Sequence, residues 1–234
     1  MLEGLILLFA AFVHGLVGFA FALLAVPLLS FLLSLKLVVP LMALFGTTIN
    51  ALLLLSLWRY FELRRIFSLL VGAFPGVVAG AYFLAKAPES WLKGLLGVIL
   101  ISYGLWGLIN PRPKIRLGDR WGYLFGFLAG ALGAALMTSG PPVVIYVTLK
   151  GWEKNEIKST LQGYFLVLGI LVILSHLSRG LLTSMVGFSY FKFLPLVLIG
   201  LFLGHRVYQS LSLGWYLRFL YGLLILAGVL ALWS

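Results

Sequence analysis

The sequence contains no cysteine and only six acidic residues among its 234. The absence of cysteine excludes disulfides, thiolate metal sites and cysteine nucleophiles. The acidic residues lie near the N-terminus or in short polar connectors: Glu3, Glu62, Glu89, Asp119, Glu153 and Glu156. Because the long apolar runs hold no carboxylate, we expect no acidic proton relay, no metal site, no cofactor and no catalytic centre inside them.

Charged residues of both signs make up only 10% of the chain, whereas 62% of it is hydrophobic. This composition is far more apolar than that of a soluble domain and predicts an all-α polytopic membrane protein, with the lipid bilayer as its surroundings. The 17 lysines and arginines give a net charge of +11. They lie mostly in short connectors and form no dense basic stripe, which argues against nucleic acid as a partner and for a role in membrane orientation.

Eight apolar runs cover most of the chain, at roughly 4–35, 38–58, 66–85, 91–109, 121–149, 159–177, 186–204 and 215–233. The first run has no basic segment before it, so we interpret it as part of the mature protein and not as a cleaved signal. We expect one transmembrane domain over 1–234, with a first repeat at about 1–109, a Pro/Arg-rich linker at 110–118 and a second repeat at about 119–234.

The second half repeats small residues of the first half at matching intervals. His14-Gly15-Leu16-Val17-Gly18 leads to Pro27, and Ala129-Gly130-Ala131-Leu132-Gly133 leads to Pro142 at the same Gly-to-Gly and Gly-to-Pro spacings. Further on, four residues of the first half recur at one constant offset: Gly76, Gly80, Trp91 and Gly104 become Gly200, Gly204, Trp215 and Gly228. Duplicated apolar halves with Gly/Pro interruptions are typical of transporters and indicate where the substrate binds.

The first and fifth runs are about 30 residues long, more than the roughly 20 that one spanning helix needs. Each contains an interruption, predicted at Ala25-Val26-Pro27 and at Ser139-Gly140-Pro141-Pro142, where proline disfavours a continuous helix. Each run is therefore either one kinked helix or two short helices that return to their side of entry.

The distribution of cations distinguishes these alternatives. If every run crosses once, lysines and arginines divide almost evenly between the two faces. If the first and fifth runs are re-entrant, one face carries Arg59, Arg64, Arg65, Arg112, Lys114, Arg116, Arg120, Lys150, Lys154, Lys158, Arg206 and Arg218. The other face then carries only Lys36, Lys86, Lys93, Arg179 and Lys192. This asymmetry favours two inverted repeats, each a re-entrant hairpin plus three transmembrane helices, with both termini outside the inner membrane.

Interrupted helices inside a membrane must face protein or a wet cavity, because unpaired peptide groups in lipid cost several kcal/mol. A helix that begins at such a break offers N–H donors and a positive dipole end to an anion. The second break, Thr138-Ser139-Gly140-Pro141-Pro142, adds two hydroxyl donors and a glycine. The first break, at Pro27, has no hydroxyl, so we expect an asymmetric anion site with most side-chain donors in the second half.

Four other residues complete the candidate site. His14 lies inside an apolar run. Its side chain either acts in transport, by binding the substrate or carrying a proton, or is hydrogen-bonded to the backbone. Gly18, like Gly15, Gly130 and Gly133, either lines the site or packs helices together. The buried amides Asn50 and Gln162 either line a cavity or join helices.

Three stretches resemble one protein family, the TauE/SafE sulfite and organosulfonate exporters. Gly126-Phe127-Leu128-Ala129-Gly130-Ala131-Leu132-Gly133, followed by Thr138-Ser139-Gly140-Pro141-Pro142, is similar to the family's second-half signature. Gly15-Leu16-Val17-Gly18-Phe19-Ala20-Phe21 resembles the first-half signature, although Ala20 and Ala22 stand where members are often richer in glycine. Lys158-Ser159-Thr160, before Gln162-Gly163-Tyr164-Phe165, resembles the segment that follows the second signature. The resemblance implies transport of sulfite, sulfoacetate or related sulfonates across a bacterial or archaeal inner membrane.

These observations together predict a secondary transporter that exports small sulfur-containing anions by alternating access. An anion channel, or a carrier for another small organic anion, stays open as an alternative. An intramembrane enzyme that uses Ser139 with His14 is disfavoured, since no carboxylate is available to orient the histidine. The sequence does not fix the anion, the direction of transport or the coupling ion, and it leaves a homodimer open.

Overall fold

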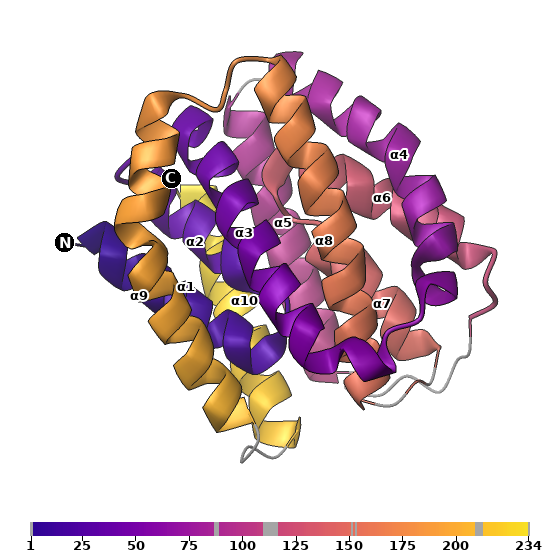
Figure 1. The fold of residues 1–234 in the computed structure, drawn as a ribbon. Helices are drawn as coiled ribbons and strands as arrows, with labels where there is room; N and C mark the ends of the chain where they lie inside the picture. The colour runs from indigo at the N-terminus through magenta and orange to yellow at the C-terminus, as the bar shows by residue number, and fades with distance from the viewer. Residues whose placement is uncertain are drawn as a thin grey trace. The chain divides into compact units, whose positions relative to one another are not determined.

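The computed structural model describes residues 2–86, 89–109, 117–150, 152, 154–208 and 213–233, and its regular elements are all helices (Figure 1). The first half forms α1 (Leu2–Val17), α2 (Phe21–Ser30), α3 (Leu35–Leu57), the 3₁₀ turn η1 (Trp58–Tyr60), α4 (Leu63–Lys86) and α5 (Glu89–Ile109). The second half forms α6 (Trp121–Leu136), α7 (Gly140–Leu149), α8 (Lys154–Ser178), α9 (Ser184–Tyr208) and α10 (Leu213–Trp233). The predicted all-α class is confirmed.

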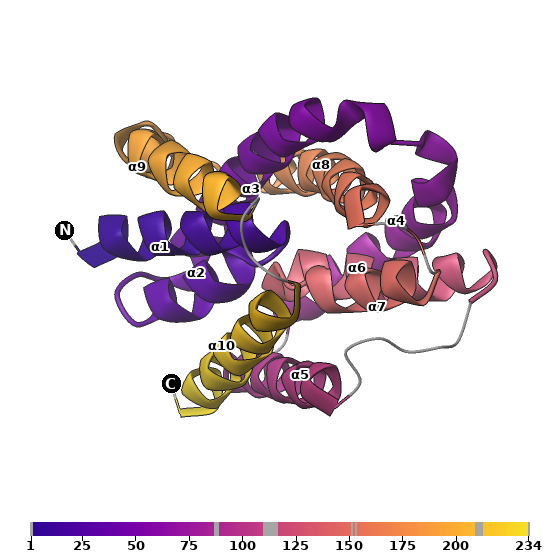
Figure 2. The same ribbon diagram turned by 90° about the horizontal axis from the view of Figure 1, so that it is seen from below.

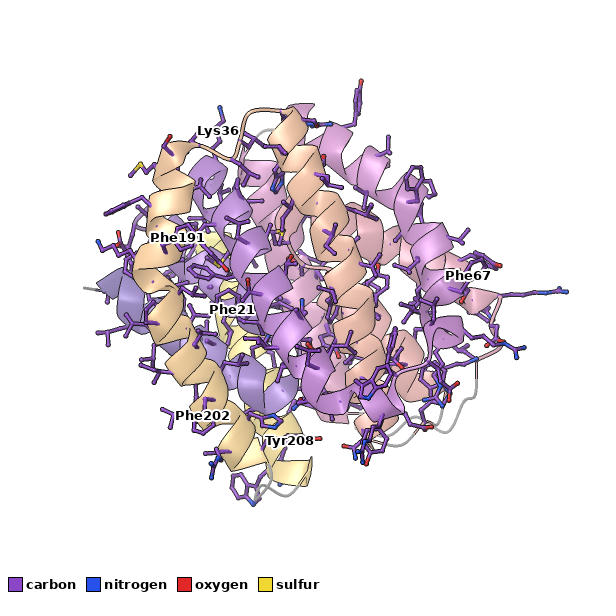
Figure 3. The ribbon with its side chains drawn as sticks, viewed as in Figure 1. Phe21, Lys36, Phe67, Phe191, Phe202 and Tyr208 are labelled. Carbon is purple, nitrogen blue, oxygen red and sulfur yellow. The ribbon has the colours of Figure 1, made fainter. Side chains whose placement is uncertain are left out.

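Several helices are long and apolar enough to cross a membrane. Four of the described segments meet this condition: Leu35–Tyr60, Leu63–Gly80, Asn155–Ser178 and Ser184–Tyr208. Large apolar side chains point outward on these helices, such as Phe67 on α4 and Phe191 and Phe202 on α9 (Figure 3). Phe191 is 73% exposed, which would be unfavourable in water and suits contact with lipid chains.

The helices form two compact units, and each unit combines segments from both halves of the sequence. Unit 1 contains residues 1–45, 88–111 and 180–234, and unit 2 contains residues 46–87 and 112–179. The boundary divides α3 after Phe45. The repeat boundaries that the sequence indicates stay a prediction, and most of the proposed linker, 110–116, lies outside the described residues.

Helix pairing follows a reciprocal pattern. In unit 1, α1 packs along α9, and in unit 2, α4 packs along α6 (Figures 1 and 2). The first helix of each half therefore contacts the fourth helix of the other half. The fifth helices of the two halves, α5 and α10, pair with each other in unit 1 (Figure 2).

The repeated glycines lie at these crossings. A Cβ on Gly200 or Gly204 of α9 would collide with the backbone of α1 at Leu8 or Phe12. Their counterparts on α4, Gly76 and Gly80, would collide in the same way with the α6 backbone at Phe127 and Ala131. Glycine permits two helix backbones to touch, and such close contact is how helices associate in lipid. The constant offset in the sequence thus encodes equivalent helix contacts.

Gly15 and Gly130 also belong to the crossings. Gly15 of α1 faces the backbone of α9 at Leu201 and Gly204, and Gly130 of α6 faces the α4 backbone at Ala73. Of the two roles that the sequence left open for these glycines, the structure supports helix packing.

The fifth apolar run is a hairpin and not a kinked rod. Its two ends meet, because the Leu117 N–H donates to the Leu149 carbonyl at 3.1 Å. Lys150, at the end of α7, donates to the Leu117 carbonyl at 3.2 Å and pairs with Asp119 before α6. The first run is likewise divided into two helices, α1 and α2, that pack against each other.

We expect Gly80→Ala to destabilise the protein by about 1–3 kcal/mol, because the added methyl group meets backbone atoms that cannot move alone. Gly187→Ala in α9 is the matched control, since a Cβ there has no neighbour within 4 Å and alanine favours helix by roughly 0.5–1 kcal/mol. Thermal unfolding in detergent measures both variants. Equal melting temperatures for the two would contradict the assigned contact.

Candidate functional site

The second break interrupts the hairpin of unit 2 between α6 and α7. Met137 ends α6 in the left-handed conformation, with φ 54°. Its N–H donates to the Gly133 carbonyl at 3.0 Å, and the Thr138 N–H donates to the Leu132 carbonyl at 3.3 Å. These bonds satisfy carbonyls at the end of α6. The predicted interruption at Thr138 and Ser139 is therefore confirmed.

The rest of the predicted break begins the next helix. Gly140, Pro141 and Pro142 form the first turn of α7, where proline is tolerated because its missing N–H would have no helical partner. The two prolines also remove two of the amide donors that a helix start ordinarily offers to an anion. Ser139 occupies the N-cap position but makes no side-chain capping bond. Ser139 is partly exposed, and its hydroxyl is a side-chain donor at this helix start.

The predicted first break at Ala25-Val26-Pro27 is wrong. Pro27 lies inside α2, and the chain turns instead at Gly18-Phe19-Ala20. Gly18 has φ 89°, a conformation that glycine adopts without strain. Proline near the end of a short helix removes one backbone bond only, and described helices α3, α4 and α9 also contain a proline. Conformational freedom at Gly18, and not proline, determines this turn.

His14 closes the first break. Its Nδ1 accepts a hydrogen bond from the Phe21 N–H, the first amide of α2, at 3.1 Å. Its own carbonyl accepts from the Gly18 N–H at 2.6 Å. His14 is 3% exposed, and a nitrogen that accepts a bond carries no proton. Of the alternatives that the sequence left open, the structure supports the backbone-bonded one for Nδ1.

The two hairpin turns therefore differ. At the spacing of the repeat, Ala129 occupies the position that corresponds to His14, so no equivalent side chain caps α7. The turn in unit 1 is closed by an imidazole, whereas the turn in unit 2 leaves the Ser139 hydroxyl uncommitted to capping. The asymmetric anion site that the sequence indicates stays a prediction.

The predicted site residues are divided between the units. Unit 1 contains His14, Gly18 and Pro27. Unit 2 contains Thr138-Ser139-Gly140-Pro141-Pro142 together with Asn50 and Gln162. Within unit 2, Thr138, Asn50 and Gln162 are 1%, 5% and 0% exposed, so all three polar side chains belong to its interior.

Asn50 belongs to the part of α3 that runs antiparallel to α8. Thr47 meets Gly169 in the middle of α8, and the Ser159 hydroxyl near its start donates to the Tyr60 carbonyl at 2.9 Å. Asn50, one turn after Thr47, lies on the stretch of α3 between these contacts. Its buried Oδ1 has no hydrogen-bond partner within the part of unit 2 that the structure describes. A buried amide oxygen without a partner is costly, so this stretch of α3 is a candidate place for a ligand or water that donates a hydrogen bond.

Cations and aromatic rings lie close together at the end of unit 2 where α8 starts, which we call the cation-rich end. Arg65 pairs with Glu62 at 2.9 Å and Glu156 at 2.7 Å, and its guanidinium lies 5.2 Å from the ring of Trp152. Lys150 pairs with Asp119, and this bond and charge hold the pKa of the Asp119 carboxyl below its usual value. Described carboxylates at this end are thus neutralised. Arg59, Arg64, Arg120 and Lys158 add further positive charge.

The sequence interpretation missed three features of this region. Lys158, expected in a connector, is only 4% exposed, on the second turn of α8. Thr160 and Tyr164, which the sequence analysis names only within a stretch that resembles the family, are fully buried. Their spacing of four residues puts both hydroxyls on one face of a helix. This spacing is the feature of the sequence from which the pair could have been found.

The family model described as Sulfite exporter TauE/SafE matches residues 4–231. Neither the curated proteins nor the solved structures contain a match to the chain.

We expect His14→Leu to lower the free energy of unfolding by about 1–3 kcal/mol, because the buried Phe21 N–H loses its acceptor. His14→Asn is the matched variant, since its Oδ1 can accept from the same amide at the position of Nδ1. Chemical unfolding in detergent micelles measures the difference. A leucine variant as stable as the asparagine variant would show that the cap contributes nothing.

Proposed function

The chain belongs to the TauE/SafE family of sulfite exporters, and we propose that it is a secondary carrier that exports sulfite, sulfoacetate or a related sulfonate across the inner membrane. The family is one of membrane transport, and the apolar helices of the structure agree with it. The observation that carries the proposal is the interrupted hairpin of unit 2. At its break, the Ser139 hydroxyl makes no capping bond to the helix that follows. The described acidic groups near the cation-rich end of unit 2 are all paired with cations.

The proposed site is centred on Ser139, with Thr138 and the Gly140 backbone beside it and the amides Asn50 and Gln162 from α3 and α8. Sulfur oxyanions accept several hydrogen bonds at once, and charge-assisted bonds of this kind are the strong ones. Hydroxyl and amide donors without a carboxylate suit such an anion and disfavour a cation. His14 and Gly18 support the first hairpin turn, and Pro27 has no role as a break.

The proposed mechanism is alternating access by inverted repeats. The reciprocal pairing of α1 with α9 and of α4 with α6 supports it, because two equivalent sets of contacts give two arrangements of similar energy. The glycine crossings make each pair a rigid element, so the motion occurs at the hairpins and connectors.

We propose further that the cation-rich end of unit 2 faces the cytoplasm. Positive residues are retained on the cytoplasmic side of membrane proteins, and the ion pairs place the starts of α4 and α8 at one end. Both termini are then outside.

The first test is uptake of labelled sulfite and sulfoacetate into proteoliposomes. We expect the double variant Ser139→Ala, Thr138→Val to reduce transport at low substrate at least tenfold, because bonds to a charged ligand contribute about 1.5–3 kcal/mol each. Ser178→Ala is the control, since its hydroxyl bonds only locally to the Ser175 carbonyl at the far end of α8. Undiminished transport by the double variant would refute the site. Flux that never saturates and shows no counterflow would identify a channel instead.

The second test is side-specific labelling, which the natural absence of cysteine permits. Arg64→Cys lies at the cation-rich end and Arg179→Cys follows the opposite end of α8, and both positions are exposed. An impermeant thiol reagent added to intact cells is expected to label the second variant and not the first. The reverse pattern would invert the proposed topology.

A further inference from the structure

Two hydroxyl groups in the interior of unit 2 have no hydrogen-bond partner. The side chains of Thr160 and Tyr164 are both 0% exposed, and neither Thr160 Oγ1 nor Tyr164 Oη is hydrogen-bonded to any described residue. Leaving a buried hydroxyl unpaired is unfavourable, and native proteins rarely keep such groups without a ligand or ordered water to satisfy them. Two such groups on one helix, each able to donate a hydrogen bond, point to a common acceptor.

The two hydroxyls lie on the face of α8 that contacts the hairpin break. Thr160, Tyr164 and Leu168 follow one another at intervals of four residues and so share one face of α8. Leu168 lies against Gly133, because its Cδ2 is 3.2 Å from the position that a Cβ added to Gly133 would occupy. The Cβ of Ser139 lies 3.1 Å from the same point. The face of α8 that carries the two hydroxyls is therefore the face that meets the α6–α7 turn.

The other end of this face lies beside the cations. Glu156, four residues before Thr160 on the same face of α8, is paired with Arg65, and the buried Lys158 lies in the same part of the helix. The field at this end is positive, which favours an anion and repels a cation. An anion has only acceptor atoms, and both hydroxyls can donate to it.

We propose that Thr160 and Tyr164 line the path along which an oxyanion moves between the cation-rich end of unit 2 and the Ser139 break, donating their hydroxyl hydrogens to it in turn. The proposal rests on the proposed transport function and extends it, because it adds two substrate-contacting residues and an internal route along α8. It also accounts for two unpaired hydroxyls that helix packing alone leaves unexplained.

The test by removal uses Tyr164→Phe and Thr160→Val, which delete a hydroxyl and keep the shape of each side chain. We expect each to raise the KM for sulfoacetate transport roughly tenfold without lowering thermal stability, since no protein partner is lost. Tyr221→Phe is the control, because Tyr221 is a buried tyrosine of unit 1 on α10. An unchanged KM together with a lower melting temperature in Tyr164→Phe would assign its hydroxyl to structure and overturn the proposal.

The test by accessibility does not depend on knowing the substrate. Thr160→Cys is treated with an anionic sulfonatoethyl and a cationic trimethylammonioethyl methanethiosulfonate, and the ratio of rates is normalised to that of a small free thiol. We expect a ratio at least fivefold in favour of the anionic reagent. Leu69→Cys is the control, since Leu69 is equally buried but lies on α4, where its backbone faces Gly126 of α6.

The outcomes separate the two proposals. Anion-selective reaction at Thr160→Cys in a protein that transports no sulfur oxyanion would overturn the proposed substrate and retain the path. Active transport with Thr160→Cys as inert as Leu69→Cys, or reactive without preference for the anion, would overturn the path and retain the transport function.

Discussion

A helix cannot be interrupted in an apolar environment unless the freed peptide groups find partners, and this constraint shapes both hairpins. In the first, the imidazole of His14 accepts the leading amide of α2 while Gly18 takes the left-handed turn. In the second, the carbonyls near the end of α6 are bonded by Met137 and Thr138, and two prolines reduce the number of amides that need partners at the start of α7. The first solution is complete within the protein. The second leaves the Ser139 hydroxyl without a capping bond, which is why the proposed chemistry is concentrated in unit 2.

Close backbone contact at glycine holds these hairpins in place. Each hairpin's first helix is fixed to the fourth helix of the other half through Gly15, Gly200 and Gly204 in one unit and through Gly76, Gly80 and Gly130 in the other. Helices that touch at their backbones suit rigid-body motion, so the proposed mechanism assigns the movement to the turns and connectors. At the cation-rich end, the ion pair of Arg65 with Glu156 joins α4 to α8, and that of Lys150 with Asp119 joins the end of α7 to the start of α6.

Much of this arrangement could be predicted from the sequence, for identifiable reasons. The hairpin of the fifth run was predictable because its length, its Ser-Gly-Pro-Pro break and the sorting of cations all agreed. The first break was misplaced because proline is a stronger signal in a sequence than glycine, although a membrane helix tolerates Pro27 and only Gly18 permits the turn. The role of Gly15 and Gly130 could not be decided, since packing and lining need the same small residue. The burial of Lys158, Thr160 and Tyr164 depends on which helices cover α8, which periodicity does not specify.

Binding of a sulfur oxyanion at the α6–α7 break can be measured by ligand protection at one residue. Ser139→Cys in the otherwise cysteine-free protein is alkylated with iodoacetamide in the presence and absence of sulfoacetate, with chloride at equal ionic strength as the reference. We expect sulfoacetate to slow alkylation in a saturable manner and chloride to leave the rate unchanged. Alkylation at the same rate in both solutions, in protein that is shown to transport sulfoacetate, would contradict binding at this break.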